Sequence, residues 1–200
     1  MTDKERERLE DMIIAILLSQ PKIRHEKNGR SLFFKLDQRK IVIFLDYLQR
    51  FNIKSQFNFD YDSMEGQIFP SVMLENVLRK WVCHEHIQVV DPISLRLNAY
   101  YIWIGLFAKK TLNSVAIPTD LDIGLQHTLS RLFREQFETD LIPGNLMQIK
   151  PFRRVMLTAI KTNRPMEESM ELSYLLPHKE KDEIKTLVAE WEEERSNYAF

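Results

Sequence analysis

Cysteine and glycine are scarce in this chain of 200 residues, and each shortage excludes a class of site. A single cysteine, Cys83, allows no disulfide within the chain, as is usual for proteins of a reducing compartment. The five glycines form neither a G-x-G-x-x-G fingerprint nor a P-loop, the loops that hold nucleotide phosphates. The G-x-S-x-G turn of serine hydrolases is also missing. Nucleotide-binding and serine-hydrolase functions are therefore not predicted.

Long apolar runs are absent as well. No stretch reaches the roughly 20 apolar residues that a membrane span needs. The highly charged start, MTDKERERLEDM, lacks the apolar core of a secretion signal. We therefore expect a cytoplasmic protein with no membrane partner.

The net charge of −1 conceals an uneven distribution of charge. Residues 1–165 carry 24 basic and 19 acidic side chains, whereas residues 166–200 carry 4 basic and 10 acidic ones. A basic surface supplies most of the non-specific affinity for DNA, so the first part permits DNA binding. The acidic end predicts a separate helical extension that could dock a protein partner.

The string Cys-His-Glu-His at residues 83–86 is the one cluster with zinc-ligand chemistry. Ligands this close in sequence are poorly placed to converge on one ion, and no second Cys/His pair lies nearby. We predict no metal site here and no cofactor for the chain.

Residues 22–81 alternate between strand and helix patterns. The string KIRHEKNGRSLFFKLD predicts two strands joined by a turn at Asn28-Gly29. A helix is expected over 38–51, followed by a strand with Phe57, Phe59 and Tyr61 pointing inward and by a second strand, GQIFPSV. The next helix shows an apolar stripe with helical spacing, made by Leu74, Val77, Leu78 and Trp81. With the apolar helix near Met12, these elements make a helix–hairpin–helix–hairpin–helix unit.

The second half begins the same order again. A helix over 95–108 leads to the strand SVAIPT, and Thr119 then has the pattern of a helix cap. The later string LIPGNLMQIKPF is predicted to be too short for a full hairpin, so the second unit is expected to be eroded. A helix over 152–162 closes it, and another helix follows Pro177. We predict an α/β (α+β) fold with repeats at 10–90 and 91–165 and an acidic helical extension at 166–200.

Several strings lie in the order and near the spacing of one known family. They are MIIAILLSQPKI, RSLFFKLDQRKIVIFLDYLQRF, the junction LENVLRKWV…VVDP, LRLNAYYIWIGLFAKKTLN and SVAIPTD. Together, over roughly residues 10–160, they resemble the LAGLIDADG family of homing endonucleases. The resemblance implies a pseudo-twofold repeat whose two signature helices pack against each other. Small residues would allow that close approach: Ala15, Ser19, Gly105 and Ala108.

The same resemblance exposes an absence at the ends of the signature helices. In the family each helix ends in an acid that binds a catalytic metal ion, and here those positions fall near Gln20 and near Lys109 and Lys110. Hard divalent cations require oxygen ligands, preferably anionic ones, and ammonium groups repel them. We therefore expect no catalytic residue and no bound metal, and the chain is not expected to cleave DNA.

Loss of cleavage leaves DNA binding open. The resemblance implies that the strands enter the major groove, where basic and amide side chains recognise phosphates and bases. The residues expected to face DNA are Arg24, Lys27, Arg30, Lys35, Gln56 and Asn58. Acidic residues on or near the same surface count against this interpretation: Asp37, Asp60, Asp62 and Glu65.

The leading hypothesis is a catalytically inactive, monomeric protein that binds double-stranded DNA. Such a protein would be associated with the nucleoid and could have a regulatory function. The first alternative is a protein-interaction module derived from the same fold, which the near-neutral charge and the acidic tail favour. The second alternative is a metal-dependent endonuclease with altered ligands.

Overall fold

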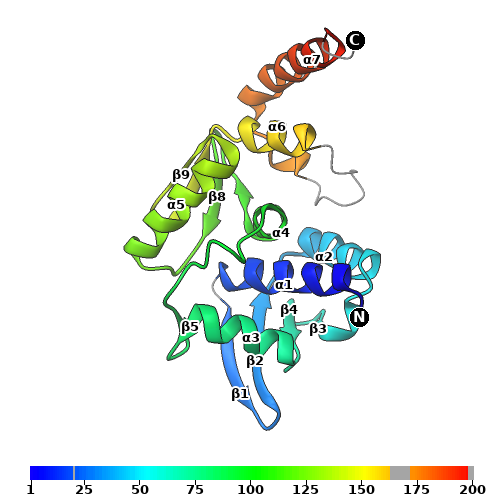
Figure 1. The fold of residues 1–200 in the computed structure, drawn as a ribbon, viewed down its shortest axis with the longest axis vertical. Coiled ribbons are helices and arrows are strands. Elements are labelled where there is room, and N and C mark those ends of the chain that lie inside the picture. Colours follow the sequence, from blue (N-terminus) through cyan, green and yellow to red (C-terminus); the bar gives the residue numbers. More distant parts are fainter. Residues whose placement is uncertain (20, 163–171, 198–200) are drawn as a thin grey trace.

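The computed structural model describes residues 1–19, 21–162 and 172–197, the last four as backbone. Two units with the same order of elements follow one another along the chain (Figure 1). The first unit comprises α1 (Asp3–Leu17), β1 (Lys22–Glu26), β2 (Gly29–Lys35), α2 (Gln38–Arg50), β3 (Phe57–Asp60), β4 (Glu65–Ile68) and α3 (Val72–Trp81). The second comprises α4 (Leu97–Phe107), β7 (Lys109–Lys110), β8 (Val115–Pro118), α5 (Ile123–Phe137), β9 (Asp140–Ile142), β10 (Leu146–Lys150) and α6 (Arg153–Lys161).

Shorter elements join or extend the two units. A small hairpin, β5 (Val82–Cys83) with β6 (His86–Ile87), lies between them. Three single turns of 3-10 helix are η1 (Lys54–Gln56), η2 (Ser173–Leu175) and η3 (His178–Glu180), and the chain continues as α7 (Lys181–Asn197). Figure 1 shows the β1–β2 hairpin projecting at one end of the molecule and α6 and α7 at the other. Among the described residues, no helix is long and apolar enough to cross a membrane.

The two units build sheets of the same topology. The first sheet has the strand order β1-β2-β4-β3 and the second β7-β8-β10-β9, with antiparallel pairing throughout. The second sheet is made of strands of two, four, three and five residues, against five, seven, four and four in the first. The predicted α+β fold with a repeated order and a shortened second unit is confirmed.

One detail of that prediction is wrong, because residues 140–150 do form a hairpin. Strands β9 and β10 pair in register from Gln148 with Ile142 to Lys150 with Asp140. The strand starts one residue earlier than the quoted string, and the three-residue link Pro143–Asn145 is short enough for strands of this length to pair.

Two further expectations are corrected. The helix after β8 is capped by Asp122, whose side chain accepts from the Leu125 backbone N–H at 2.9 Å, while the predicted cap Thr119 is buried in the link before the helix. Tyr61 is 59% exposed because β3 ends at Asp60 and the tyrosine lies in the following turn.

The two central helices, α1 and α4, pack against each other and form the middle of the core. Helix α1 begins at Asp3, well before the expected start near Met12, because a capping box forms at its N-terminus. The Thr2 hydroxyl accepts from the Glu5 N–H at 3.2 Å, and the Glu5 carboxylate accepts from the Thr2 N–H at 2.7 Å. These bonds support two charged turns that lack an apolar stripe.

A buried polar cluster joins α1 to the start of α4. The Asp11 carboxylate, fully buried, accepts from Arg96 Nε and from Asn98 Nδ2, each at 2.8 Å. Asn98 Nδ2 also donates to the Tyr47 hydroxyl on α2 at 3.0 Å. The contact between the two repeats therefore has a fixed register as well as an apolar core.

The described part of the C-terminal extension folds back onto the rest of the protein. The Tyr174 hydroxyl donates to the backbone carbonyl of Gly105 at 2.5 Å. The buried Glu180 carboxylate accepts from the backbone N–H groups of Phe152 at 3.2 Å and Arg153 at 2.5 Å, at the first turn of α6. The extension is thus attached to the end of α4 and to the start of α6.

Candidate nucleic-acid interface

The first sheet has one face covered by helices and one open face. Leu32, Phe34 and Ile68 are buried on the covered face. Because successive side chains alternate and paired residues share a face, the register assigns the opposite side chains to the open face. This first open face consists of Lys22, Arg24, Glu26, Phe33, Lys35, Asn58, Asp60, Glu65 and Gln67, and Ser31 lies on the same side but is fully buried.

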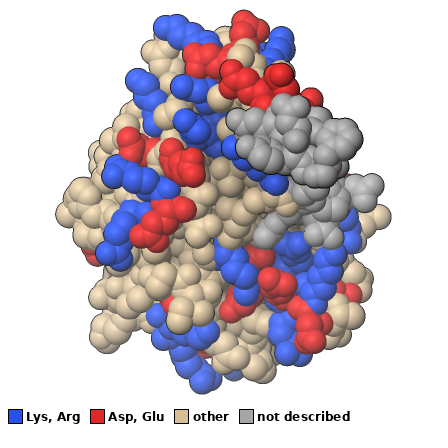
Figure 2. Space-filling view, turned by 45° about the horizontal axis from the view of Figure 1, so that its top comes forward, with Lys and Arg blue, Asp and Glu red and all other residues tan. Residues whose placement is uncertain are grey.

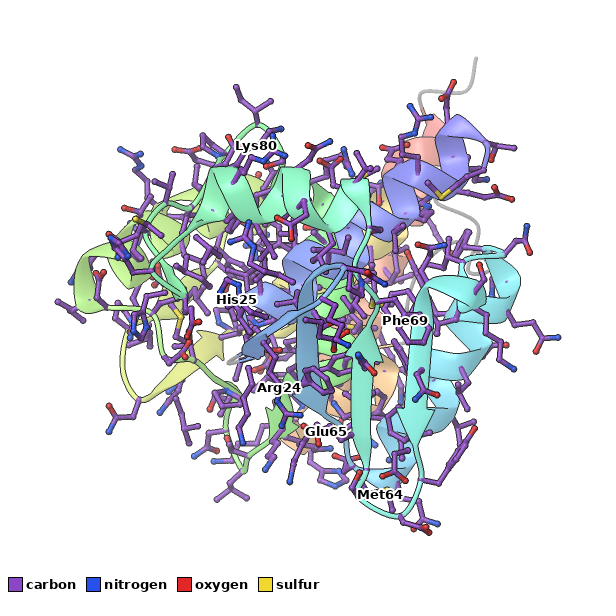
Figure 3. The ribbon with its side chains drawn as sticks, turned by 90° about the horizontal axis from the view of Figure 1, so that it is seen from below. Arg24, His25, Met64, Glu65, Phe69 and Lys80 are labelled. Atoms are coloured by element: carbon purple, nitrogen blue, oxygen red, sulfur yellow. The ribbon has the colours of Figure 1, made fainter. Side chains whose placement is uncertain are left out.

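Arg24 is held in place on this face by an aromatic ring. Its guanidinium carbon lies 4.1 Å from the centre of the Phe33 ring. This cation–π contact orients the planar group while the side chain stays exposed. Figure 3 labels Arg24 in the view from below the molecule. Beside it, the Gln67 amide donates to Glu26 at 2.9 Å. The face therefore offers a pre-oriented guanidinium within a polar surface.

The other predicted DNA-facing residues occupy different positions. Lys27 is exposed in the β1–β2 turn, and Asn58 and Lys35 are exposed on the first open face. Gln56 is half-buried in η1, just before β3 begins. Apart from Gln56, these side chains are accessible, and their role in DNA binding remains a prediction.

The expectation that Arg30 points outward is wrong. Arg30 has the same parity on β2 as Leu32, so it lies on the covered face. Its guanidinium donates to Glu75 of α3 through Nη2 at 2.7 Å and Nε at 3.1 Å. These bonds hold the pKa of the Glu75 carboxyl below its usual value. Arg30 ties the hairpin to α3, and the alternation of Leu32 and Phe34 was the signal that placed it there.

The second sheet presents a different open face. Its polar members are Lys109, Asp140, Gln148 and Lys150. Two large apolar side chains accompany them, Ile142 at 45% and Leu146 at 52% exposed. The pseudo-symmetry of the backbone is therefore not repeated in the surface chemistry. On the side shown in Figure 2, basic and acidic side chains are interspersed and form no field of a single sign.

A cleft of about 450 Å³ lies where both central helices end. Ser19 lies just past the end of α1 and Phe107 ends α4, and strands of both sheets supply the remaining wall. The full lining is Ser19, Lys22, Phe33, Phe34, Lys35, Leu36, Asp37, Glu65, Leu106, Phe107, Lys109 and Pro118. We call this hollow the junction cleft. The predicted packing residues Ala15, Gly105 and Ala108 are buried and do not line the cleft.

The two lysines at the expected position of the second family acid, Lys109 and Lys110, lie in different environments. Lys109 lines the junction cleft, whereas Lys110 is exposed outside the lining. Gln20, the counterpart at the end of α1, lies outside the described residues.

Lys40 was not predicted as a site residue, yet its side chain contacts the C-terminal end of α4. Its side chain is 4% exposed, and its Nζ donates to the carbonyls of Gly105 at 2.9 Å and Ala108 at 2.7 Å. Burial lowers the pKa of Lys40 to about 8, with Arg39 and Lys109 adding to the effect. A signal for its burial existed, since Lys40, Phe44 and Leu48 follow each other at intervals of four along α2.

The donor set of the junction cleft suits an anion better than a metal ion. Lys22, Lys35 and Lys109 supply three ammonium groups, against the two carboxylates of Asp37 and Glu65. Within the described residues, no three acidic, histidine or cysteine side chains are grouped so as to hold a metal ion. The Cys-His-Glu-His string forms the tight β5–β6 turn instead, with positive φ at His84 and Glu85.

Comparisons with known proteins give a structural neighbour. No protein-family model and no curated protein matches the chain. Among solved structures, the homing endonuclease I-WcaI bound to its DNA recognition sequence aligns over 89% of both chains, with a TM-score of 0.57 and 12% sequence identity. At this identity the likeness concerns architecture, so the chain has the α+β fold of a homing endonuclease.

Proposed function

We propose that this chain is a monomeric, double-stranded DNA-binding protein of the LAGLIDADG type that does not cleave DNA. In this proposal residues 10–90 and 91–165 are two repeats of that family, and residues 166–200 are an added extension. Binding would take place across the first open face and the junction cleft, and the protein would serve a regulatory role in the nucleoid.

The observation that carries the proposal is the combination of an open sheet face with a lysine-lined cleft. Strand ribbons of this kind fit the major groove of duplex DNA. A guanidinium stacked on Phe33 suits recognition of guanine or a phosphate, and the amide of Asn58 suits adenine. The neighbouring structure is itself bound to its DNA recognition sequence, which supports the choice of ligand.

The test is a titration of labelled duplex DNA with the pure protein, followed by fluorescence anisotropy between about 50 and 200 mM salt. We expect binding that weakens steeply with salt. Arg24→Gln should weaken binding by roughly tenfold, because the stacked guanidinium is worth about 1–3 kcal/mol when it contacts a base. Arg131→Gln, an exposed arginine on α5, is the matched control and should bind as the unchanged protein does. Equal affinity of the two variants for DNA would show that Arg24 does not contact the DNA.

Incubating plasmid DNA with the protein and Mg²⁺ tests the loss of cleavage. We expect intact plasmid, because the junction cleft presents ammonium groups where hard cations need carboxylates. Nicking that disappears in Asp37→Asn or Glu65→Gln would instead select the endonuclease with altered ligands.

The second open face favours one other candidate. Ile142 and Leu146 expose apolar surface at positions where a nucleic-acid-binding protein needs polar groups. Exposed apolar surface of this kind is typical of a protein-interaction module. Absence of DNA binding at the lowest salt, together with a stable protein complex that Leu146→Asp disrupts, would select that function.

A further inference from the structure

The junction cleft brings together lysines from both repeats. Lys22 lies on β1 and Lys35 ends β2 in the first repeat, while Lys109 begins β7 in the second. All three side chains are exposed, and none forms an ion pair within the described part of the chain. Their charges are therefore available to a ligand that enters the cleft.

The two carboxylates of the cleft are less available. Asp37 caps α2 by accepting from the Lys40 backbone N–H at 3.0 Å. Glu65 is the direct cross-strand partner of Lys35 and offsets part of that lysine's charge, so the cleft holds three ammonium groups against two carboxylates. The chemistry left for an incoming group is mainly cationic.

The end of α4 would ordinarily repel an anion. The unpaired carbonyls at a helix C-terminus carry partial negative charge, equivalent to about half an elementary charge. Here the ammonium of Lys40 occupies the carbonyls of Gly105 and Ala108, and the Tyr174 hydroxyl also donates to Gly105. A built-in cation therefore neutralises the helix end that faces the cleft.

We propose that the junction cleft binds a phosphodiester of bound duplex DNA through Lys22, Lys35 and Lys109, without a metal ion. This inference rests on the proposed function and names the group that the cleft holds. The cleft lies between the two sheets, so the phosphate belongs to the middle of the bound duplex. Lysine acts on it as a point charge, which strengthens binding to all sequences alike.

The experiment compares the triple variant Lys22→Gln, Lys35→Gln, Lys109→Gln with a control that loses the same charge elsewhere. The control replaces Lys80, Lys161 and Lys181, exposed lysines on the outer helices α3, α6 and α7. Duplex DNA is titrated across the salt series, once with Mg²⁺ and once with EDTA. Thermal unfolding of both variants verifies that they are folded.

We expect the slope of log affinity against log salt to flatten by about 0.9 in the cleft variant, because the three lysines hold one phosphate and each lost phosphate contact contributes about that much. Affinity at about 100 mM salt should fall at least tenfold, equally for unrelated sequences, while the control keeps its slope and EDTA has no effect. Binding with the original slope in the cleft variant, or binding that needs Mg²⁺, overturns the inference and leaves DNA binding standing. No binding by the unchanged protein overturns both proposals.

Discussion

The protonation of the buried Lys40 is linked to the stability of the fold. Its pKa is about 8 in the folded protein, below the ordinary 10.5 of an exposed lysine. Between these two values the unfolded chain binds more protons, so unfolding becomes less favourable as the pH rises. Below pH 8 the ammonium is charged in both states, and its contribution does not change with pH.

We therefore predict a pH-dependent difference between the protein and Lys40→Met. The free energy of unfolding of the protein relative to the variant should increase between about pH 8 and 10.5, by at most about 1.4 kcal/mol per pH unit. Urea unfolding of both chains at several pH values gives this difference, and groups common to both cancel. A difference that is flat across this range would mean that the ammonium is not desolvated at the end of α4.

At the scale of the element, helix α6 depends on a residue far along the chain. Glu180 accepts from the N–H groups of Phe152 and Arg153, which have no partner inside the helix. Bonds from backbone N–H groups to a buried carboxylate are worth about 1.5–3 kcal/mol, and the helix dipole adds to them.

Glu180→Gln is predicted to lower the free energy of unfolding by about 1–2 kcal/mol, since one neutral amide replaces the charged acceptor. Glu183→Gln is the control, because its ion pair with Arg153 at 2.9 Å is half exposed and is expected to contribute about 0–1 kcal/mol. Urea unfolding compares the two. Equal losses would show that the position of the carboxylate at the helix start is unimportant.

At the scale of the whole molecule, the two repeats share one interior and should unfold together. Asp11 on α1 binds Arg96 and Asn98 at the start of α4, so its loss removes the buried carboxylate that both donors share. We expect Asp11→Ala to cost about 2–4 kcal/mol, less than a fully buried pair because Arg96 is partly exposed.

Calorimetry and urea unfolding test this prediction. Asp11→Ala should lower the midpoint while keeping a single transition, because the interface of α1 with α4 belongs to both repeats. Glu7→Ala, which removes an exposed partner of Arg96 at 3.5 Å, should change little. Two separate transitions in either variant would contradict a shared interior.

Local patterns predicted the parts of the fold that local contacts decide. The stripe of Leu74, Val77, Leu78 and Trp81 is buried as expected, and the hairpin at Asn28-Gly29 forms, with Gly29 at a φ of 129°. Of the two residues of β2 that were expected to face DNA, Lys35 does lie exposed on the open face, whereas Arg30 does not.

Contacts between distant residues escaped prediction because no periodicity reports them. The bond from Lys40 to Gly105 spans 65 residues and that from Arg30 to Glu75 spans 45. The β9–β10 hairpin was missed for another reason, since a strand of three residues is too short to show alternation. The lining of the junction cleft comes from both repeats, so the sequence indicated that the family's acids are missing but did not indicate that Lys22, Lys35 and Lys109 lie together.

The unequal open faces of the two sheets have a consequence for any elongated ligand. A duplex lying across both sheets would meet Arg24, Lys22 and Asn58 on one side and the apolar Ile142 and Leu146 on the other. Palindromic targets suit proteins whose two halves are chemically alike. Under the proposed function, a chain with one backbone plan and two surface chemistries would suit a duplex target whose two halves differ, and would bind it in a single orientation.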